Sequence, residues 1–144
     1  MRNIKIRALV DTNVFIYAYE IPKSNSNLII EALNRDLFEA IITESTFKEI
    51  YRYFRKYHSK RLADTFRIYL FATCKIIFSY QLAKYSAKYA CLVDERDLEQ
   101  VIAVKEFGIK YLVSYDKHFK SVEEYKTPKQ FAELLELKTY PTNY

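Results

Sequence analysis

Two aspartates follow short apolar segments that have the composition of β-strands. Asp11 comes directly after the alternating, β-branched-rich segment 4–10, and Asp116 lies just beyond the segment 111–114. Open α/β sheets bind ligands beyond the carboxyl ends of their strands, which is where both acids would lie. Carboxylate oxygens are the ligands that hard divalent cations prefer. The pair therefore predicts a divalent-metal site made of carboxylates.

Apolar segments and helical patterns alternate along the chain, which predicts a parallel sheet covered by helices on both faces. We expect strands at 4–10, 40–42, 74–80 and 111–114, with a possible short fifth strand at 122–126. We expect helices at 14–21, from Ser24 or Ser26 to 39, from Ser45 or Thr46 to about 58, at 61–71, within 82–92, from Asp94 or Glu95 to 104, and after Thr127. Gly108, the only glycine, is expected to end the helix before it. The prediction is one α/β domain over residues 1–144, with a central sheet of about five strands.

The charge balance favours an anionic partner. Lysine and arginine number 23 against 18 acidic residues, which gives a net charge of +5. The segment 51–61 carries five cations and four aromatic residues and no acid. Such a segment is more often a solvated helix face with aromatics packed inward, but it is also a candidate surface for RNA.

The remaining composition favours a cytoplasmic protein. No run of 18 apolar residues is present, so we expect no transmembrane helix. The first residues lead into the expected strand without the pattern of a signal peptide. Cys74 and Cys91 match no zinc or redox spacing, and we expect both to be reduced thiols in the core.

Four short motifs follow one another along these elements. They are Val10-Asp11-Thr12-Asn13, Thr46-Phe47-Lys48-Glu49, Asp97-Leu98-Glu99-Gln100, and a final block of Gly108, Tyr111-Leu112-Val113-Ser114 and Asp116. In this order they resemble the PIN domain family, and particularly the VapC-type toxins of prokaryotic toxin–antitoxin pairs. The resemblance spans residues 9–134 and is weakest between 55 and 93, where only length and alternation match.

The resemblance implies a Mg²⁺- or Mn²⁺-dependent ribonuclease. Its catalytic residues, which are also its metal ligands, would be Asp11, Glu49, Asp97 and Asp116. Substrate contacts would come from polar neighbours of these acids and from the basic segment, namely Thr12, Asn13, Ser114, Arg52, Arg55 and Lys56. Hydrolysis by water would leave a 5′-phosphate and would not need the ribose 2′-hydroxyl.

Some neighbours of these positions have other interpretations. Asp94, one helical turn before Asp97, is an alternative third ligand. Tyr115 stands where relatives commonly have a small residue, and would narrow the site. We expect His58 and His118 at surface or edge positions and not as ligands, because the site is already rich in oxygen.

Each acid also has a purely structural explanation. Asp11 suits a turn, and Asp116 suits a loop or the start of a turn. Asp97 lies in the first turn of an expected helix, where the helix dipole favours acids. The spacing of Thr46 and Glu49 fits a capping box. All four acids at the spacing of one family argue for a site.

Three kinds of function remain open. The first is a toxin endoribonuclease, the second a free-standing RNA-processing nuclease, and the third a non-catalytic scaffold that binds RNA or protein. For a toxin, the resemblance implies a homodimer and a small antitoxin that covers the acidic cleft, with contacts on the helices and exposed aromatics of segment 44–89. A haloacid-dehalogenase-like phosphatase is excluded, because that family needs a second aspartate where this chain has Asn13.

Overall fold

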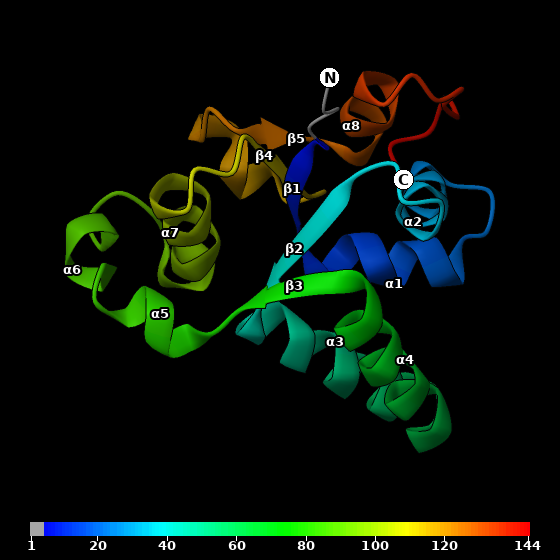
Figure 1. Cartoon of the computed structure of the whole chain (residues 1–144), viewed down its shortest axis with the longest axis horizontal. Helices are drawn as coiled ribbons and strands as arrows, with labels where there is room; N and C mark the ends of the chain where they lie inside the picture. The colour runs from blue at the N-terminus through cyan, green and yellow to red at the C-terminus, as the bar shows by residue number, and fades with distance from the viewer. Residues whose placement is uncertain (1–4) are drawn as a thin grey trace.

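Five strands form a single sheet in the order β3-β2-β1-β4-β5 (Figure 1). The structure, a computed structural model, describes residues 5–144, so the first residue of the expected strand 4–10 lies outside it. The bounds are Arg7–Val10 for β1, Glu39–Thr43 for β2, Cys74–Ile77 for β3, Tyr111–Val113 for β4 and Tyr125–Lys126 for β5. Every neighbouring pair is parallel, which confirms the predicted fold class.

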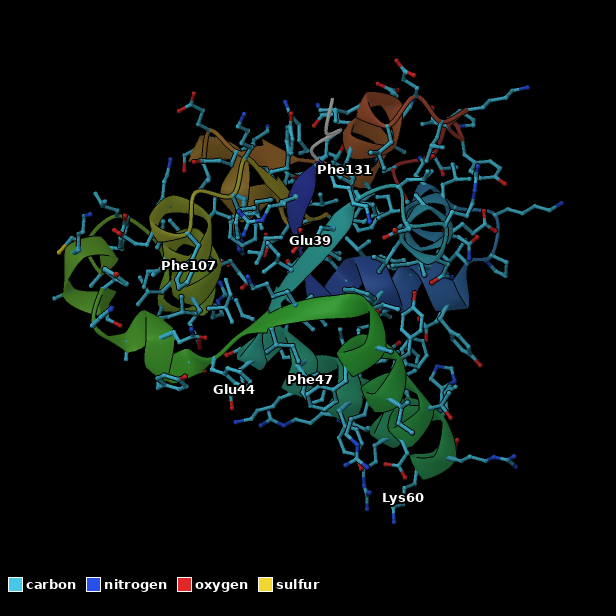
Figure 2. The ribbon with its side chains drawn as sticks, in the orientation of Figure 1. Glu39, Glu44, Phe47, Lys60, Phe107 and Phe131 are labelled. Atoms are coloured by element: carbon cyan, nitrogen blue, oxygen red, sulfur yellow. The ribbon has the colours of Figure 1, made fainter. Side chains whose placement is uncertain are left out.

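Helices connect the strands and cover the sheet. Within residues 5–144 they are α1 Thr12–Glu20, α2 Asn25–Asn34, α3 Glu44–Tyr57, α4 Lys60–Thr73, α5 Ser79–Ala83, α6 Ser86–Tyr89, α7 Leu98–Glu106 and α8 Pro128–Leu134. Two short 3-10 turns, Glu95–Asp97 and Lys117–Ser121, precede α7 and follow β4. The helices α3 and α4 form a pair that extends from the sheet, and Lys60 marks its tip (Figure 2).

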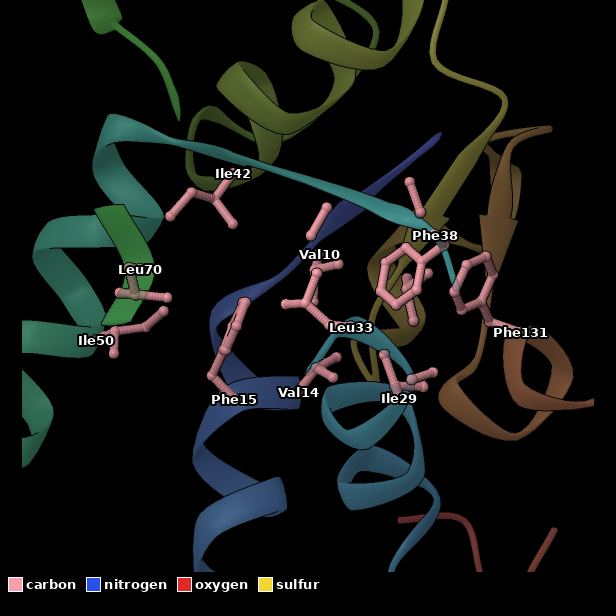
Figure 3. Packing of buried hydrophobic residues seen from close by; sticks show 14 of the residues in the cluster. Val10, Val14, Phe15, Ile29, Leu33, Phe38, Ile42, Ile50, Leu70 and Phe131 are labelled. Atoms are coloured by element: carbon pink, nitrogen blue, oxygen red, sulfur yellow. The ribbon is translucent and has the colours of Figure 1, made fainter. Parts of the chain in front are cut away.

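Two cores form because successive residues of a strand point to opposite faces of the sheet. Ala8 and Val10 pack against α1, α2, α3, α4 and α8, in the core that Figure 3 shows. Leu9 packs on the other face, against α5, α6 and α7. Both faces are therefore covered, as the alternation of elements predicts.

Capping side chains move several helix boundaries from the predicted positions. The helix α1 begins at Thr12 because the carboxylate of Asp11 accepts a hydrogen bond from the Thr12 amide at 2.8 Å. The helix α3 begins at Glu44 because the Thr43 hydroxyl accepts from the Thr46 amide at 3.1 Å. Thr46 is therefore not the cap, and the capping-box explanation of Glu49 is wrong.

Other differences lie where the chain turns. The helix α2 ends at Asn34 and not at 39, and Asp36 then adopts the left-handed region with φ of 60°. The third strand ends at Ile77 and not at 80, and the expected helix within 82–92 is replaced by the short helices α5 and α6. The fifth strand has only two residues.

The end of α7 matches its prediction. Gly108 has φ of +63°, and the amide of Ile109 donates to the carbonyl of Val104 at 3.0 Å. This is the pattern of a Schellman motif, in which glycine takes the left-handed position after the helix. The turn directs the chain into β4.

Two further predictions concern the cysteines and membrane-spanning helices. Cys91 is exposed, so the prediction of a core thiol is wrong for it, while Cys74 is half-buried and burial raises the pKa of its thiol to about 11. None of the helices in residues 5–144 is both long enough and apolar enough to cross a membrane.

Candidate active site

The four predicted acids line one cavity of about 260 Å³. They come from four different parts of the chain: Asp11 between β1 and α1, Glu49 on α3, Asp97 before α7 and Asp116 after β4. The strands β1 and β4 are neighbours, with Val10 opposite Val113, so the residues that follow them emerge at the same edge of the sheet. The expected position at the carboxyl ends of adjacent strands is therefore found.

Asp11 is held by three donors. Its Oδ1 accepts from the Thr12 amide at 2.8 Å and from Nε2 of Gln100 at 3.1 Å, and its Oδ2 accepts from Oγ of Ser114 at 2.7 Å. The amide of Asp11 donates to the carbonyl of Val113 at 3.0 Å, which continues the pairing of β1 with β4. A carboxylate that only accepts hydrogen bonds is oriented by this arrangement in its ionised form.

Asp97 and Asp116 approach each other with His118 beside them. One ligand atom from each of the three residues can be chosen so that all lie within 4.8 Å of one another. Nδ1 of His118 lies 3.1 Å from Oδ1 of Asp116 and 3.8 Å from Oδ2 of Asp97. Asp97 is buried, whereas the His118 side chain is 55% exposed. His118 is thus at the edge of the site, as expected, yet within reach of its acids.

Glu49 lies at the open side of the cavity. It is exposed on the second turn of α3, and its Oε2 accepts from the hydroxyl of Thr12 at 2.7 Å. This bond joins the start of α1 to α3, so Thr12 faces the acids as predicted. Glu49 is thus the most exposed of the four acids, whereas Asp97 is buried and Asp11 is half-buried.

Burial and mutual repulsion make the site costly to charge. Burial raises the pKa of Asp11 above its ordinary value, and the charge of Asp116 adds to this, against the hydrogen bonds from Ser114, the Thr12 amide and Gln100 that lower it. Burial, followed by the charge of Asp116, likewise raises the pKa of Asp97. Carboxylates that lie close together despite the repulsion between their charges fit a divalent cation. Such an ion prefers oxygen ligands and compensates the negative charge.

Asp94 and Asp97 have different positions. The carboxylate of Asp94 accepts from the guanidinium of Arg96 at 3.2 Å and from its amide at 3.2 Å, and it lies outside the lining of the cavity. Asp97 is part of the lining. Of the two candidates for the third ligand, the geometry places Asp97 with the other acids, while Asp94 holds Arg96 at the rim.

Ser114 and Tyr115 differ from their predicted positions. Ser114 is fully buried, donates to Asp11 and accepts from the Asp116 amide at 2.9 Å, so it positions the two acids and cannot contact a substrate. Asn13 accepts from the Tyr115 amide at 3.3 Å and also lines the cavity. The Tyr115 ring turns away from the acids and its hydroxyl meets Ser26, so it does not narrow the site.

The basic residues of α3 divide between two faces. Arg52 and Lys56 follow Glu49 at helical spacing and share its exposed face. Arg55 instead donates to the hydroxyl of Tyr51 at 3.3 Å, which in turn donates to Asp64 of α4. Arg55 therefore faces α4 and not the acids.

Gln100 is the main residue of the site that had no predicted role. Its Nε2 donates to Asp11 and to the hydroxyl of Thr46, which lie 3.1 and 3.0 Å away. Its Oε1 is buried and has no hydrogen-bond partner among the described residues. The available signal was a polar side chain within the apolar sequence of α7, because an amide on the buried face of a helix needs a partner.

The fold and the site together define a class: parallel α/β proteins with a carboxylate centre at the carboxyl edge of the sheet. The sequence profile of the PIN domain matches residues 7–118, well over half of the chain. The chain belongs to the PIN domain family.

Solved structures share the fold. The structure of a toxin–antitoxin complex from Klebsiella pneumoniae contains a similar chain, with a TM-score of 0.65 and 20% identity, covering 84% of this chain and 97% of that one. The crystal structure of VapBC2 from Rickettsia felis bound to a DNA fragment from their promoter contains another, with a TM-score of 0.59 and 16% identity, covering 85% and 98%. No curated protein matches the chain.

Proposed function

We propose that this protein is a Mg²⁺- or Mn²⁺-dependent endoribonuclease whose centre is formed by Asp11, Glu49, Asp97 and Asp116. The observation that carries the proposal is the convergence of these four acids, from four separate elements, on one cavity of a PIN domain. The raised pKa values of Asp11 and Asp97 support a divalent cation as the partner of these carboxylates.

We further propose that the protein is the toxin of a VapBC-type pair in the cytoplasm. The support is structural, because similar chains occur in two toxin–antitoxin assemblies. A small antitoxin and a second copy of this chain would be its partners. Light-scattering mass of the protein alone, and after co-expression with the product of the neighbouring reading frame, tests both partners; a monomer that captures no such product would contradict them.

In the proposed hydrolysis, the residues around the cavity have different roles. A bound divalent cation would supply positive charge to the scissile phosphate and acidify the attacking water. Ser114, Gln100 and the Thr12 amide hold the carboxylate of Asp11 in a fixed orientation. Asp97 or Asp116 accepts the proton of the attacking water, since both carboxylates line the same cavity.

The first experiment measures cleavage of a mixed RNA pool by wild type and Asp11→Asn, each with Mg²⁺, Mn²⁺ or EDTA. We expect cleavage that requires the metal and is lost in the variant. Asp36→Asn is the matched control. Asp36 lies before β2, at the amino-terminal ends of the strands and away from the four acids, and asparagine tolerates the positive φ of this position. No cleavage by folded, partner-free wild type would favour the scaffold alternative.

The chemistry of the products gives a second test. Attack by water leaves a 5′-phosphate and a 3′-hydroxyl, so the fragments should be ligatable at their 5′ ends. A 2′,3′-cyclic phosphate would exclude this mechanism, because it requires attack by the ribose 2′-hydroxyl.

A further inference from the structure

A second, larger hollow of about 770 Å³ lies directly beside the acidic cavity. It is lined by four lysines, namely Lys117, Lys120, Lys126 and Lys129, and by one acid, Glu133. None of the four lysines forms an ion pair within residues 5–144. The hollow is thus an uncompensated positive surface next to a negative one.

One chain segment separates the two surfaces. After β4 the side chains alternate: Ser114 and Asp116 turn to the acidic site, while Tyr115 and Lys117 line the hollow. The backbone of Asp116 is extended, with φ of −76° and ψ of 112°, which produces this alternation. A polymer that places one phosphate at Asp116 would therefore have its neighbouring units at the hollow.

Aromatic rings complete the hollow. Tyr115, Tyr125 and Tyr144 line it, and the rings of Tyr115 and Tyr144 lie 5.7 Å apart. Tyr144 is 44% exposed, so its ring is open to a ligand. The segment that carries Tyr144 is fixed by Asn25, whose side chain bonds backbone atoms of Tyr140 and Thr142.

We infer that this hollow binds single-stranded RNA next to the cleaved phosphate, with the lysines on the backbone and Tyr144 stacked on a base. Unpaired cations with interleaved aromatic rings are the combination that single-stranded nucleic acids recognise. The inference rests on the proposed function, and it assigns the substrate a path along the segment after β4, on a different element from Arg52 and Lys56 of α3.

The test measures binding of a 5′-fluorescein-labelled, mixed-sequence single-stranded RNA in EDTA, so that no cleavage is needed. The combined variant Lys117→Ala, Lys120→Ala, Lys126→Ala and Lys129→Ala should lower the salt dependence of binding by roughly 0.7 for each lost phosphate contact, or roughly 3 in total. The control replaces Arg35, Lys75, Lys84 and Lys110 by alanine and removes the same charge. These four residues are exposed and line neither the acidic cavity nor the hollow, and Lys75 lies on β3, the edge strand opposite β5.

Tyr144 provides the test of stacking. Tyr144→Ala should weaken RNA binding by roughly ten-fold, and Tyr144→Phe should bind as wild type, because the ring and not the hydroxyl makes the contact. Polyglutamate, an anion without bases, should compete weakly and independently of Tyr144. Equal competition by polyglutamate would show a site for acidic chains and would overturn the assignment to RNA.

Binding and cleavage together separate this inference from the proposed function. Equal RNA binding by the hollow variant and the control variant overturns the inference, even if the wild type cleaves RNA. If RNA binding depends on the lysines of the hollow but no metal-dependent cleavage is found, the RNA site in the hollow is supported and the proposed nuclease activity is refuted.

Discussion

Asp11 combines two opposing demands in one side chain. Three donors hold its carboxylate in place, while burial and the charge of Asp116 disfavour that charge and raise its pKa. In the proposed nuclease, a bound cation would recover this free energy. Residues at functional sites often carry such a cost in stability.

The cost predicts the pH dependence of stability. Below the ordinary pKa of 3.8, Asp11 is protonated in both the folded and the unfolded protein, so it carries no penalty in stability. As the pH rises from 3.8 through the raised pKa of the folded state, the unfolded protein loses this proton more readily, and the free energy of unfolding falls. Wild type in EDTA should therefore lose stability relative to Asp11→Asn as the pH rises. Thermal melts at about pH 4 and about pH 8 measure this, where 1 kcal/mol corresponds to roughly 2–4 °C. A melting temperature of wild type that rises with pH relative to that of Asp11→Asn would contradict it.

Gln100 should matter for metal binding without being a ligand itself. Gln100→Ala frees the carboxylate of Asp11, and loss of such an orienting partner typically lowers metal affinity by roughly 10–100-fold. Calorimetric titration with Mn²⁺ in the absence of RNA measures the loss. Thr46→Val is the matched control, because it removes the other bond of the same amide and should cost less. Unchanged affinity in Gln100→Ala would show that Asp11 needs no such partner.

The sequence predicted which acids meet, but not what holds them. Strand-end position and family resemblance were enough for Asp11 and Asp116. The inward turn of Ser114 and the bridge from Gln100 to Asp11 depend on how α7 packs against β1, which no local pattern records. The prediction that Tyr115 narrows the site was wrong for a similar reason. The side chains alternate in direction after β4, and β4 ends at Val113, one residue earlier than predicted.

At the scale of elements, α7 is the support of the site, because it follows Asp97 directly and carries Gln100. Its turn at Gly108 has φ of +63°, and no atom lies within 4 Å of the position that a Cβ would take. Gly108→Ala should therefore cost about 1 kcal/mol through backbone conformation alone, or roughly 2–4 °C in a thermal melt. Gly108→Asn should cost less, because asparagine tolerates this region. An equal loss in both variants would point to packing instead.

Long, strongly periodic helices and apolar strands were predictable as elements, and their boundaries were not. Caps decided the boundaries: Asp11 and Thr43 start α1 and α3 two or so residues early, through bonds that need the folded turn. The segment 82–92 has helical spacing, yet it contains only the end of α5 and the whole of α6, whose residues Leu82 and Tyr89 both belong to the core that α7 shares.

At the scale of the whole molecule, a bound cation should act as a stabiliser of the fold. The proposed ligands lie on α3, directly after β1, just before α7 and shortly after β4. Binding would therefore link elements that are far apart in the sequence. At a Mn²⁺ concentration of about 100 times the dissociation constant, the gain is about 2.7 kcal/mol, or roughly 5–10 °C.

Variants of two acids decide which of them belongs to the site. Asp97→Asn should abolish the shift in melting temperature caused by Mn²⁺, and Asp94→Asn should retain it, because only Asp97 lines the cavity. The reverse result would reassign the third ligand to Asp94.

The pairing of β1 with β4 has a consequence in time. The strands β1, β2 and β3 and the helices α1 to α7 precede β4 in the chain, so the partner that completes the centre of the sheet leaves the ribosome only with residues 111–113. Asp97 comes shortly before this strand and Asp116 shortly after it. Contacts between such distant segments form late, because the intervening chain must first be ordered. A nascent or prematurely terminated chain that lacks residue 116 therefore carries Asp11 and Glu49 without Asp116, so the proposed carboxylate centre would be complete only after β4 and Asp116 have been synthesised.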